Sequence, residues 1–322
     1  DGNILGRLYV KKYFPESSKK KIAEMIENVR SVYGERIEKL TWMSAGTKQM
    51  AKKKLSTFTY KIGYPDKWED YGSIKVKPNA LIENAISNMN WSHNKMLGDV
   101  GKPVDKTRWY MAPQMVNAYY NPLNNEVVFP AGILQAPFFN PNADDAVNYG
   151  GIIAVIGHEF THGFDDQGAQ YDETGNLKNW WTEDDANNFK NLSSNYIKYF
   201  SNFEALPGVN INGELTIGEN IADLGGLTLA YYALKRSLVG KPEPAKIDGF
   251  TWQQRFFLSW AQVWHNNIKD EELRNRLQTD PHSPARYRIN GPLKHLPEFY
   301  EAWGVKQGDK MWLPDTERIS IW

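Results

Sequence analysis

The spacing of apolar residues along the chain predicts a mostly helical protein. In the first 70 residues, apolar positions recur three and four apart, which is the period of an α-helix. We expect helix caps at Ser17 or Ser18 and at Ser44 or Thr47, and the second helix should end near Gly63. Further helices are predicted over residues 79–97, 182–204, 218–238, 251–269 and 270–278.

One stretch has the pattern of a β-hairpin. Residues 116–120 and 126–129 are rich in Val, Tyr and Phe, and they flank a five-residue turn at 121–125. Residues 150–157 are apolar nearly all round, which favours a buried helix over a surface helix. The expected fold class is therefore α+β and mostly α, with a small sheet.

Composition and charge narrow the function. The 322 residues include 38 Lys and Arg against 38 Asp and Glu, so no net field favours nucleic acid as a partner. The basic runs at 19–21 and 52–54 lie in helical stretches, and a solvated helix face is the favoured interpretation. The absence of cysteine excludes thiol nucleophiles, so any metal site must use histidines and carboxylates.

The segment His158-Glu159-Phe160-Thr161-His162 carries the strongest chemical signal. A helix advances about 100° per residue, so residues four apart lie on one face. Both histidines can therefore reach one Zn²⁺, while Glu159 can contact a water on that metal and accept its proton. The alternative is a helix with two unrelated histidines, but burying two imidazoles and a carboxylate is costly without a partner.

A catalytic zinc needs a third protein ligand, and Glu219 is the best candidate. Glu219 and Asp223 are also four apart, so one can bind the metal while the other orients a histidine. Asp165 is a second candidate for that orienting role. Spacing alone more often indicates a solvated acidic stripe on a helix.

At this point the chain resembles the neprilysin-like metallopeptidases, family M13, which includes neprilysin, endothelin-converting enzyme and bacterial PepO. Several independent motifs occur in the family's order, and the resemblance runs through nearly the whole chain. The matching segments are residues 6–10, 117–120, 129–135, 155–166, 218–223, 260–264 and 282–284, with Arg288 and Trp322.

The resemblance implies a thermolysin-like zincin fold with one Zn²⁺ per chain. It assigns His158, His162 and Glu219 as the zinc ligands, and Glu159 as the general base. The implied activity is an endopeptidase that hydrolyses oligopeptides, and the PepO-like bacterial members are the nearest in character because Ile319 stands where the vertebrate enzymes carry a cysteine.

The resemblance also assigns residues that periodicity does not reveal. Asp165 and Asp223 correspond to the carboxylates that orient the histidines, and Asp223 counts among the catalytic residues. His282 is implied to stabilise the oxyanion, although taken alone it reads as an ordinary loop histidine. Arg288 is implied to bind substrate carbonyl or carboxylate groups, which suits its planar fork.

Substrate contacts follow from the same resemblance. Asn117 and Ala118 correspond to an edge segment that pairs with the peptide backbone. A pocket for the side chain after the scissile bond is implied, with cleavage on the amino side of large hydrophobic residues. Taken alone, Ile133 and Val155 would be interpreted as ordinary core residues. The pocket positions are Phe138, Ile133, Val155 and Trp264.

The family also implies a domain division. Residues 1–70 correspond to the last helices of an N-terminal gate region, and residues 71–322 to the catalytic domain. The remaining gate region is the expected partner, and the expected location is the bacterial cell envelope or the exterior, with the cytoplasm as the alternative. Two rival functions stay open, a peptide-binding protein without turnover and a structural zinc site in a scaffold or adhesion protein.

Overall fold

The structure is a computed structural model that describes residues 2–322, and most of them are helical. The longer helices are α1 (Gly2–Tyr13), α2 (Glu16–Lys39), α3 (Ala45–Ser56), α4 (Leu81–Asp99), α6 (Ala154–His162), α7 (Glu183–Ser201), α8 (Ile217–Ser237), α9 (Trp252–Val263), α10 (Asp270–Thr279) and α11 (Ala285–Leu293). The shorter elements are α5 (Asp145–Asn148), α12 (Pro297–Trp303), a π-helix η1 (Tyr149–Ile153) and the 3₁₀ turns η2 (Gly168–Gln170) and η3 (Asp315–Glu317).

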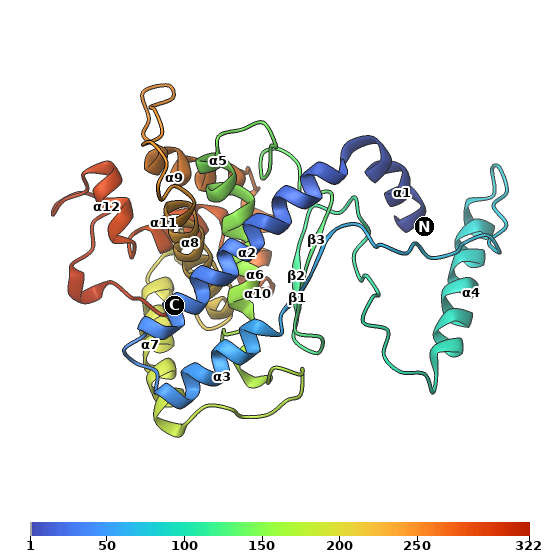
Figure 1. The fold of residues 1–322 in the computed structure, drawn as a ribbon, viewed down its shortest axis with the longest axis horizontal. Coiled ribbons are helices and arrows are strands. Elements are labelled where there is room, and N and C mark those ends of the chain that lie inside the picture. Colours follow the sequence, from blue (N-terminus) through green and yellow to red (C-terminus); the bar gives the residue numbers. More distant parts are fainter. Residues whose placement is uncertain (1) are drawn as a thin grey trace.

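The strands form two small sheets. They are β1 (Thr59–Gly63), β2 (Tyr119–Asn121), β3 (Glu126–Pro130), β4 (Glu204–Leu206) and β5 (Val209–Asn210). The larger sheet has the order β1-β3-β2, with β3 parallel to β1 and antiparallel to β2. Every residue of the central strand β3 is buried. Figure 1 shows this sheet between the helical body and α4, which stands apart.

The sequence predicted the fold class, and the structure confirms a mostly helical α+β chain with a small sheet. The third strand, β1, was missed because the second helix was expected to run to about Gly63. That helix ends at Ser56, and the β-prone stretch after it pairs with β3. The predicted cap at Ser17 or Ser18 was wrong, since α2 begins directly after Pro15, whereas Ser44 does cap α3.

The boundaries of other predicted elements also shift. The hairpin's first strand is Tyr119–Asn121, so residues 116–118 lie outside it. The helix predicted over 150–157 is divided, because Gly151, inside η1, has non-helical angles (φ −91°, ψ −105°). A Cβ on Gly151 would lie 2.4 Å from the carbonyl oxygen of Phe138, so the chain there passes too close for any side chain. The helix predicted over 251–269 ends at Val263, and α11 and α12 were not predicted.

A close crossing of α6 and α8 positions the polar residues of both helices. A Cβ on Gly226 would lie 2.5 Å from the backbone nitrogen of His158 and from the carbonyl oxygen of Ala154. A Cβ on Gly157 would lie 2.8 Å from the carbonyl oxygen of Gly226. Only glycine permits backbones to approach this closely. The crossing brings the first two turns of α8 against the histidines of α6.

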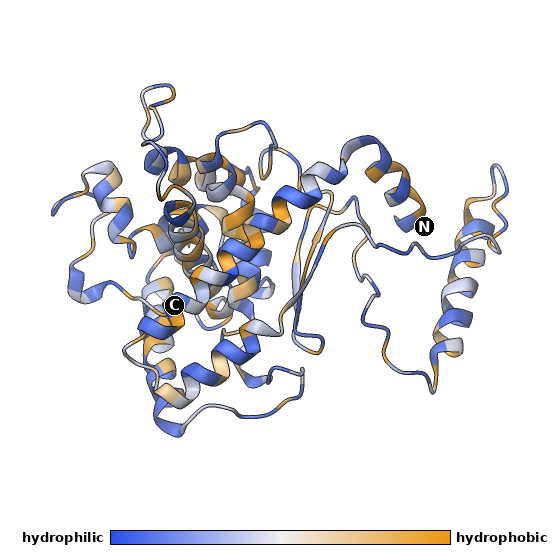
Figure 2. Cartoon of the chain, in the orientation of Figure 1, coloured by the Kyte–Doolittle hydropathy of each residue, from blue (hydrophilic) through white to orange (hydrophobic). Residues whose placement is uncertain are grey.

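The N-terminal helices share the core of the rest of the chain. Buried residues of α2, such as Ile22, Ile26 and Val29, belong to one apolar cluster with α6 and α8. Figure 2 shows apolar residues gathered on the helices of this body. The division at residue 70 stays a prediction. One sheet contains strands from both predicted segments, because β1 (before residue 70) pairs with β3 (after it).

We expect Gly226→Ala to separate α6 from α8. The added methyl group meets backbone atoms rather than a flexible side chain, so the free energy of unfolding should fall by at least about 2 kcal/mol. Gly98→Ala in α4 is the matched control: nothing lies within 4 Å of its Cβ position, so it should stabilise the helix by roughly 0.5–1 kcal/mol. Urea unfolding of both variants measures the change in the free energy of unfolding, which should be opposite in sign. An unchanged free energy in Gly226→Ala would contradict the close crossing.

Candidate active site

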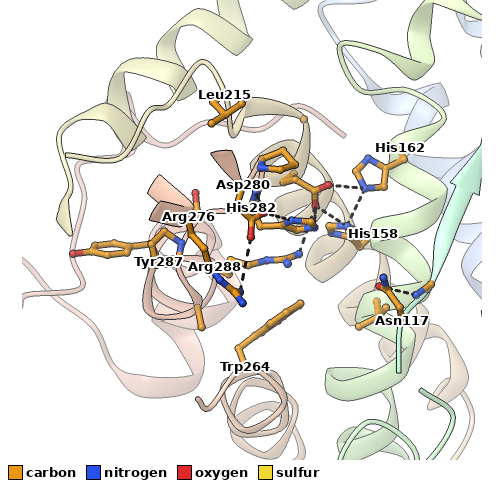
Figure 3. A pocket seen from close by; sticks show the side chains of 18 of the residues that line it. Asn117, His158, His162, Leu215, Trp264, Arg276, Asp280, His282, Tyr287 and Arg288 are labelled. Carbon is orange, nitrogen blue, oxygen red and sulfur yellow. Dashed lines mark hydrogen bonds and ion pairs between the residues drawn. The ribbon is translucent and has the colours of Figure 1, made fainter. Parts of the chain in front are cut away.

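His158 and His162 lie at the carboxyl end of α6, one turn apart, as their spacing predicted. Their Nε2 atoms are 3.0 Å apart. Figure 3 shows both rings pointing into the same cleft. The helix that carries them is buried along most of its length, so its packing fixes the two ring positions.

A carboxylate holds the other nitrogen of each ring. His158 Nδ1 lies 2.8 Å from Asp223 Oδ1, and His162 Nδ1 lies 2.6 Å from Asp165 Oδ2. A carboxylate accepts a hydrogen bond, so each Nδ1 carries the proton and each neutral ring presents its Nε2 lone pair to the other. Two lone pairs 3.0 Å apart repel unless a cation lies beside both of them.

Glu219 completes a group of three side chains that could hold a metal ion. Its Oε2 is 3.2 Å from His158 Nε2, and its Oε1 is 3.6 Å from His162 Nε2. Within residues 2–322, the buried Oε2 has no hydrogen-bond donor. Ligand atoms of the two histidines and Glu219 all lie within 4.8 Å of one another. Two imidazole nitrogens and one carboxylate this close together fit a zinc ion with an open fourth position.

Protons compensate the same charge when no metal is bound. Burial by itself lowers the pKa of His158, but Asp223 and Glu219 outweigh burial and raise that pKa to about 10. Burial opposes ionisation of Glu219 as well, yet its close contact with His158 and the charges of the neighbouring histidines hold its pKa far below the usual range. The site is therefore built to contain positive charge, which a metal would supply at neutral pH.

Arg288 binds the carboxylate that orients His158. Its Nε and Nη2 donate to Asp223 at 2.8 and 2.7 Å, and its guanidinium carbon lies 3.8 Å from the centre of the Trp264 ring. Arg288 Nη2 also lies 3.8 Å from Glu219 Oε2. The arginine thus contributes a permanent positive charge to a cluster rich in carboxylates. Its predicted contact with substrate stays a prediction.

Glu159 is buried at the bottom of the cleft, next to the histidines. Burial raises the pKa of its carboxyl above the usual range, although His158 and His162 pull in the other direction. A carboxylate made more basic by its surroundings is suited to accept a proton near neutral pH.

His282 reaches the site from the loop before α11. Its Nε2 lies 3.2 Å from Glu219 Oε2, and its Nδ1 lies 2.7 Å from Asp280 Oδ1. The side chain is 45% exposed, so it lies at the wall of the cleft rather than beneath it. Asp280 was missed in the sequence, although its position two residues before His282 is a signal for such a pair.

The cleft has a volume of about 1410 Å³, and the predicted substrate residues line it. Asn117 is exposed and uses its own side-chain oxygen to accept the backbone N–H of Ala118 at 3.0 Å. Both residues come directly before β2, an edge strand of the sheet. The four pocket positions from the sequence, Ile133, Phe138, Val155 and Trp264, all line the same cleft.

The remaining histidines lie away from the metal-compatible group, as the sequence interpretation left them. His93 and His265 are exposed. His295 is buried, and its Nδ1 accepts the backbone N–H of Ile319 at 3.0 Å. The run at 52–54 was only partly interpreted correctly, because Lys54 is buried rather than solvated.

This fold and site define a zincin-like domain of the metallopeptidase type. Two family models described as peptidase family M13 match the chain, over residues 2–65 and 117–319. The chain belongs to peptidase family M13.

Known proteins agree with this assignment. Human neprilysin is 39% identical over 321 residues, which cover 96% of this chain and 43% of neprilysin. The zinc metalloprotease Zmp1 of Mycobacterium tuberculosis, solved in complex with an inhibitor, is 45% identical with a TM-score of 0.94; the match covers 100% of this chain and 49% of that one. PepO from Lactobacillus rhamnosis is 34% identical with a TM-score of 0.89, over 99% of this chain and 49% of that one.

The chain spans less than half the length of the curated relatives it matches. In residues 2–322, none of the helices combines the length and the apolar character needed to cross a bilayer. The cellular location expected from the sequence stays a prediction.

We expect zinc to raise the melting temperature of this chain, and His162→Gln to remove that effect. Loss of one of three ligands should weaken zinc binding more than the roughly 100-fold seen for supporting residues. His93→Gln is the matched control because His93 is exposed and lies outside the site. Thermal unfolding with added zinc or chelator measures the shift, and an equal shift in His162→Gln would exclude this residue as a ligand.

Proposed function

We propose that this chain is a zinc-dependent endopeptidase that hydrolyses oligopeptides. The observation that carries the proposal is the set of His158, His162 and Glu219, with the buried Glu159 beside it at the bottom of an open cleft. Membership of family M13 supports it, because its relatives include metalloproteases. Three protein ligands leave a coordination position for water, whereas a structural zinc site is closed by four.

Glu159 carries the proton transfers in the proposed reaction. A bound zinc would lower the pKa of a water molecule and polarise the peptide carbonyl. Glu159 accepts a proton from the water as its oxygen bonds to the carbonyl carbon. The same proton then passes to the amide nitrogen as the C–N bond breaks. The products are an amine and a carboxylic acid, and the acid then gives its proton to the amine or to solvent.

His282 is the proposed donor to the oxyanion that forms on the carbonyl oxygen. Its Nε2 lies 3.2 Å from Glu219 Oε2, and Asp280 Oδ1 accepts a hydrogen bond from Nδ1. The contact with Asp280 orients the ring so that Nε2 faces the cleft. Arg288 adds a fixed positive charge to the same side of the site and, through Asp223, fixes the ring of His158.

The substrate would lie along the cleft as an extended chain. Asn117 and Ala118 stand at the start of the edge strand β2, where a peptide backbone can pair. Ile133, Phe138, Val155 and Trp264 give the cleft a mainly apolar wall near Glu159. We infer cleavage on the amino side of large hydrophobic residues, because such a side chain buries most apolar surface there.

The gate region inferred from the family resemblance stays a proposal as a partner. Residues 2–65 match the N-terminal model of the family. Helix α4, which stands apart in Figure 1, exposes several large apolar side chains that a helical partner of this kind would cover. They include Leu81, Ile82, Ile86, Met89, Met96 and Leu97.

We expect Glu159→Gln to bind zinc as wild type does and to lose peptide cleavage. The amide has the shape of the carboxylate but cannot take the proton, so the rate should fall by at least about 100-fold. Mass spectrometry of a peptide digest measures cleavage, and chelator competition measures zinc. Substantial turnover by pure Glu159→Gln would contradict the assigned base, and saturable peptide binding without any product in wild type would favour a pure binding protein.

A peptide library should show cleavage before large apolar residues, and a chelator should abolish it. Val155→Trp would fill the proposed pocket and shift the preference towards small residues, by about tenfold or more in kcat/KM for a Phe substrate. Val116→Trp, at an exposed position of the same cleft, is the control. An unchanged profile for Val155→Trp would place the side-chain pocket elsewhere.

A further inference from the structure

Lys54 is an almost completely buried lysine, with 1% of its surface exposed. It lies near the end of α3, and its ammonium group donates to the carbonyl oxygens of Gly163, Gly168 and Tyr171 at 2.6, 2.7 and 2.8 Å. An ammonium group has three hydrogens, so all three are used on one loop.

Burial disfavours the charge of this ammonium, whereas carbonyl oxygens and aromatic rings around it favour that charge. The rings of Tyr120, Phe164 and Trp180 lie 5.5–5.9 Å from Nζ, and burial lowers the pKa of Lys54 to about 7 while Asp165 and Asp172 oppose that fall. A methionine would fill the same apolar space at a lower desolvation cost. The lysine therefore has a use beyond filling the core.

The loop that Lys54 holds begins directly after the second histidine of α6. Within it, Asp165 uses Oδ2 to bind His162 Nδ1 and uses Oδ1 to accept the backbone N–H groups of Gln167 and Gly168. Of the three carbonyls that bind Lys54, that of Gly163 precedes Asp165 in the chain, and those of Gly168 and Tyr171 follow it. The ammonium thus fixes the backbone on both sides of the carboxylate that orients His162.

We propose that Lys54 is a positioning residue of the metal centre, which acts by holding the loop 163–171 so that Asp165 keeps His162 in its metal-binding orientation. The inference rests on the proposed zinc function. Lys54 lies outside the residues that line the cleft, so it does not contact substrate. It also lies within residues 2–65, so the segment matched by the N-terminal family model would contribute directly to the metal centre.

The test compares Lys54→Met with Lys53→Met. Lys53 is the neighbouring residue of α3 and is 57% exposed, in an ion pair with Glu173. We expect Lys54→Met to weaken zinc binding about tenfold, as supporting residues of metal sites do, and to change the visible spectrum of the cobalt-substituted protein. Lys53→Met should retain the zinc affinity and cobalt spectrum of wild type.

A second control separates positioning from general stability. Tyr300 in α12 donates to the carbonyl oxygen of Lys294 and accepts from the N–H of Leu313, away from the cleft. Tyr300→Phe should lower the melting temperature yet leave the zinc affinity and the cobalt spectrum unchanged. A cobalt spectrum that changes equally in Tyr300→Phe and Lys54→Met would overturn the proposal.

Lys54→Arg keeps the charge and provides a variant should Lys54→Met fail to fold. Its planar guanidinium cannot converge on three carbonyls as an ammonium does, so we expect zinc affinity to fall severalfold. Wild-type affinity in folded Lys54→Met or in Lys54→Arg would overturn the proposal. Zinc binding by wild type is measured in the same series, because its absence would instead refute the proposed function.

Discussion

The close crossing of α6 and α8 is the constraint on which the site depends. Glycines at 157, 225 and 226 let the two backbones approach within distances that a Cβ would forbid. Each glycine costs roughly 1 kcal/mol in a helix interior relative to alanine, so the packing has to compensate for that loss. In return, Asp223 lies against His158, and Glu219, one turn earlier on α8, reaches both histidines.

Charge balance explains why so many polar groups can be buried together at this crossing. Asp165, Glu219 and Asp223 face the histidines, and the guanidinium of Arg288 contacts Asp223 and Glu219. Several buried carboxylates around one guanidinium would leave net negative charge, which is costly at low dielectric. A divalent metal cancels that excess, and protons on the imidazoles do so in its absence. The same buried carboxylates therefore raise the pKa of His158 and account for the predicted zinc affinity.

The sequence allowed the centre of the site to be predicted because its spacing is local. His158 and His162, or Glu219 and Asp223, share a face on any α-helix, so no tertiary knowledge was needed to pair them. His282 and Arg288 lie on a loop and a short helix, and only the family resemblance assigned them. Asp280 and the bond from Arg288 to Asp223 depend on how distant elements meet, which periodicity does not encode.

The fold was predictable to a similar degree, and its errors have the same origin. β1 is five residues long and gains its stability from pairing with β3 more than 60 residues later. Its short local pattern was therefore assigned to the helix before it.

Lys54 was interpreted as solvated because the basic run 52–54 was treated as one unit. A helical wheel separates it from its neighbours, since Thr47, Ala51 and Lys54 fall on the buried face. A charged residue at an apolar position of a helix indicates a specific set of acceptors, and here those acceptors belong to the loop that follows His162. The N-terminal segment thus supports the proposed metal centre as well as the core. Its strand β1 pairs with β3, and Lys54 of α3 binds the loop 163–171.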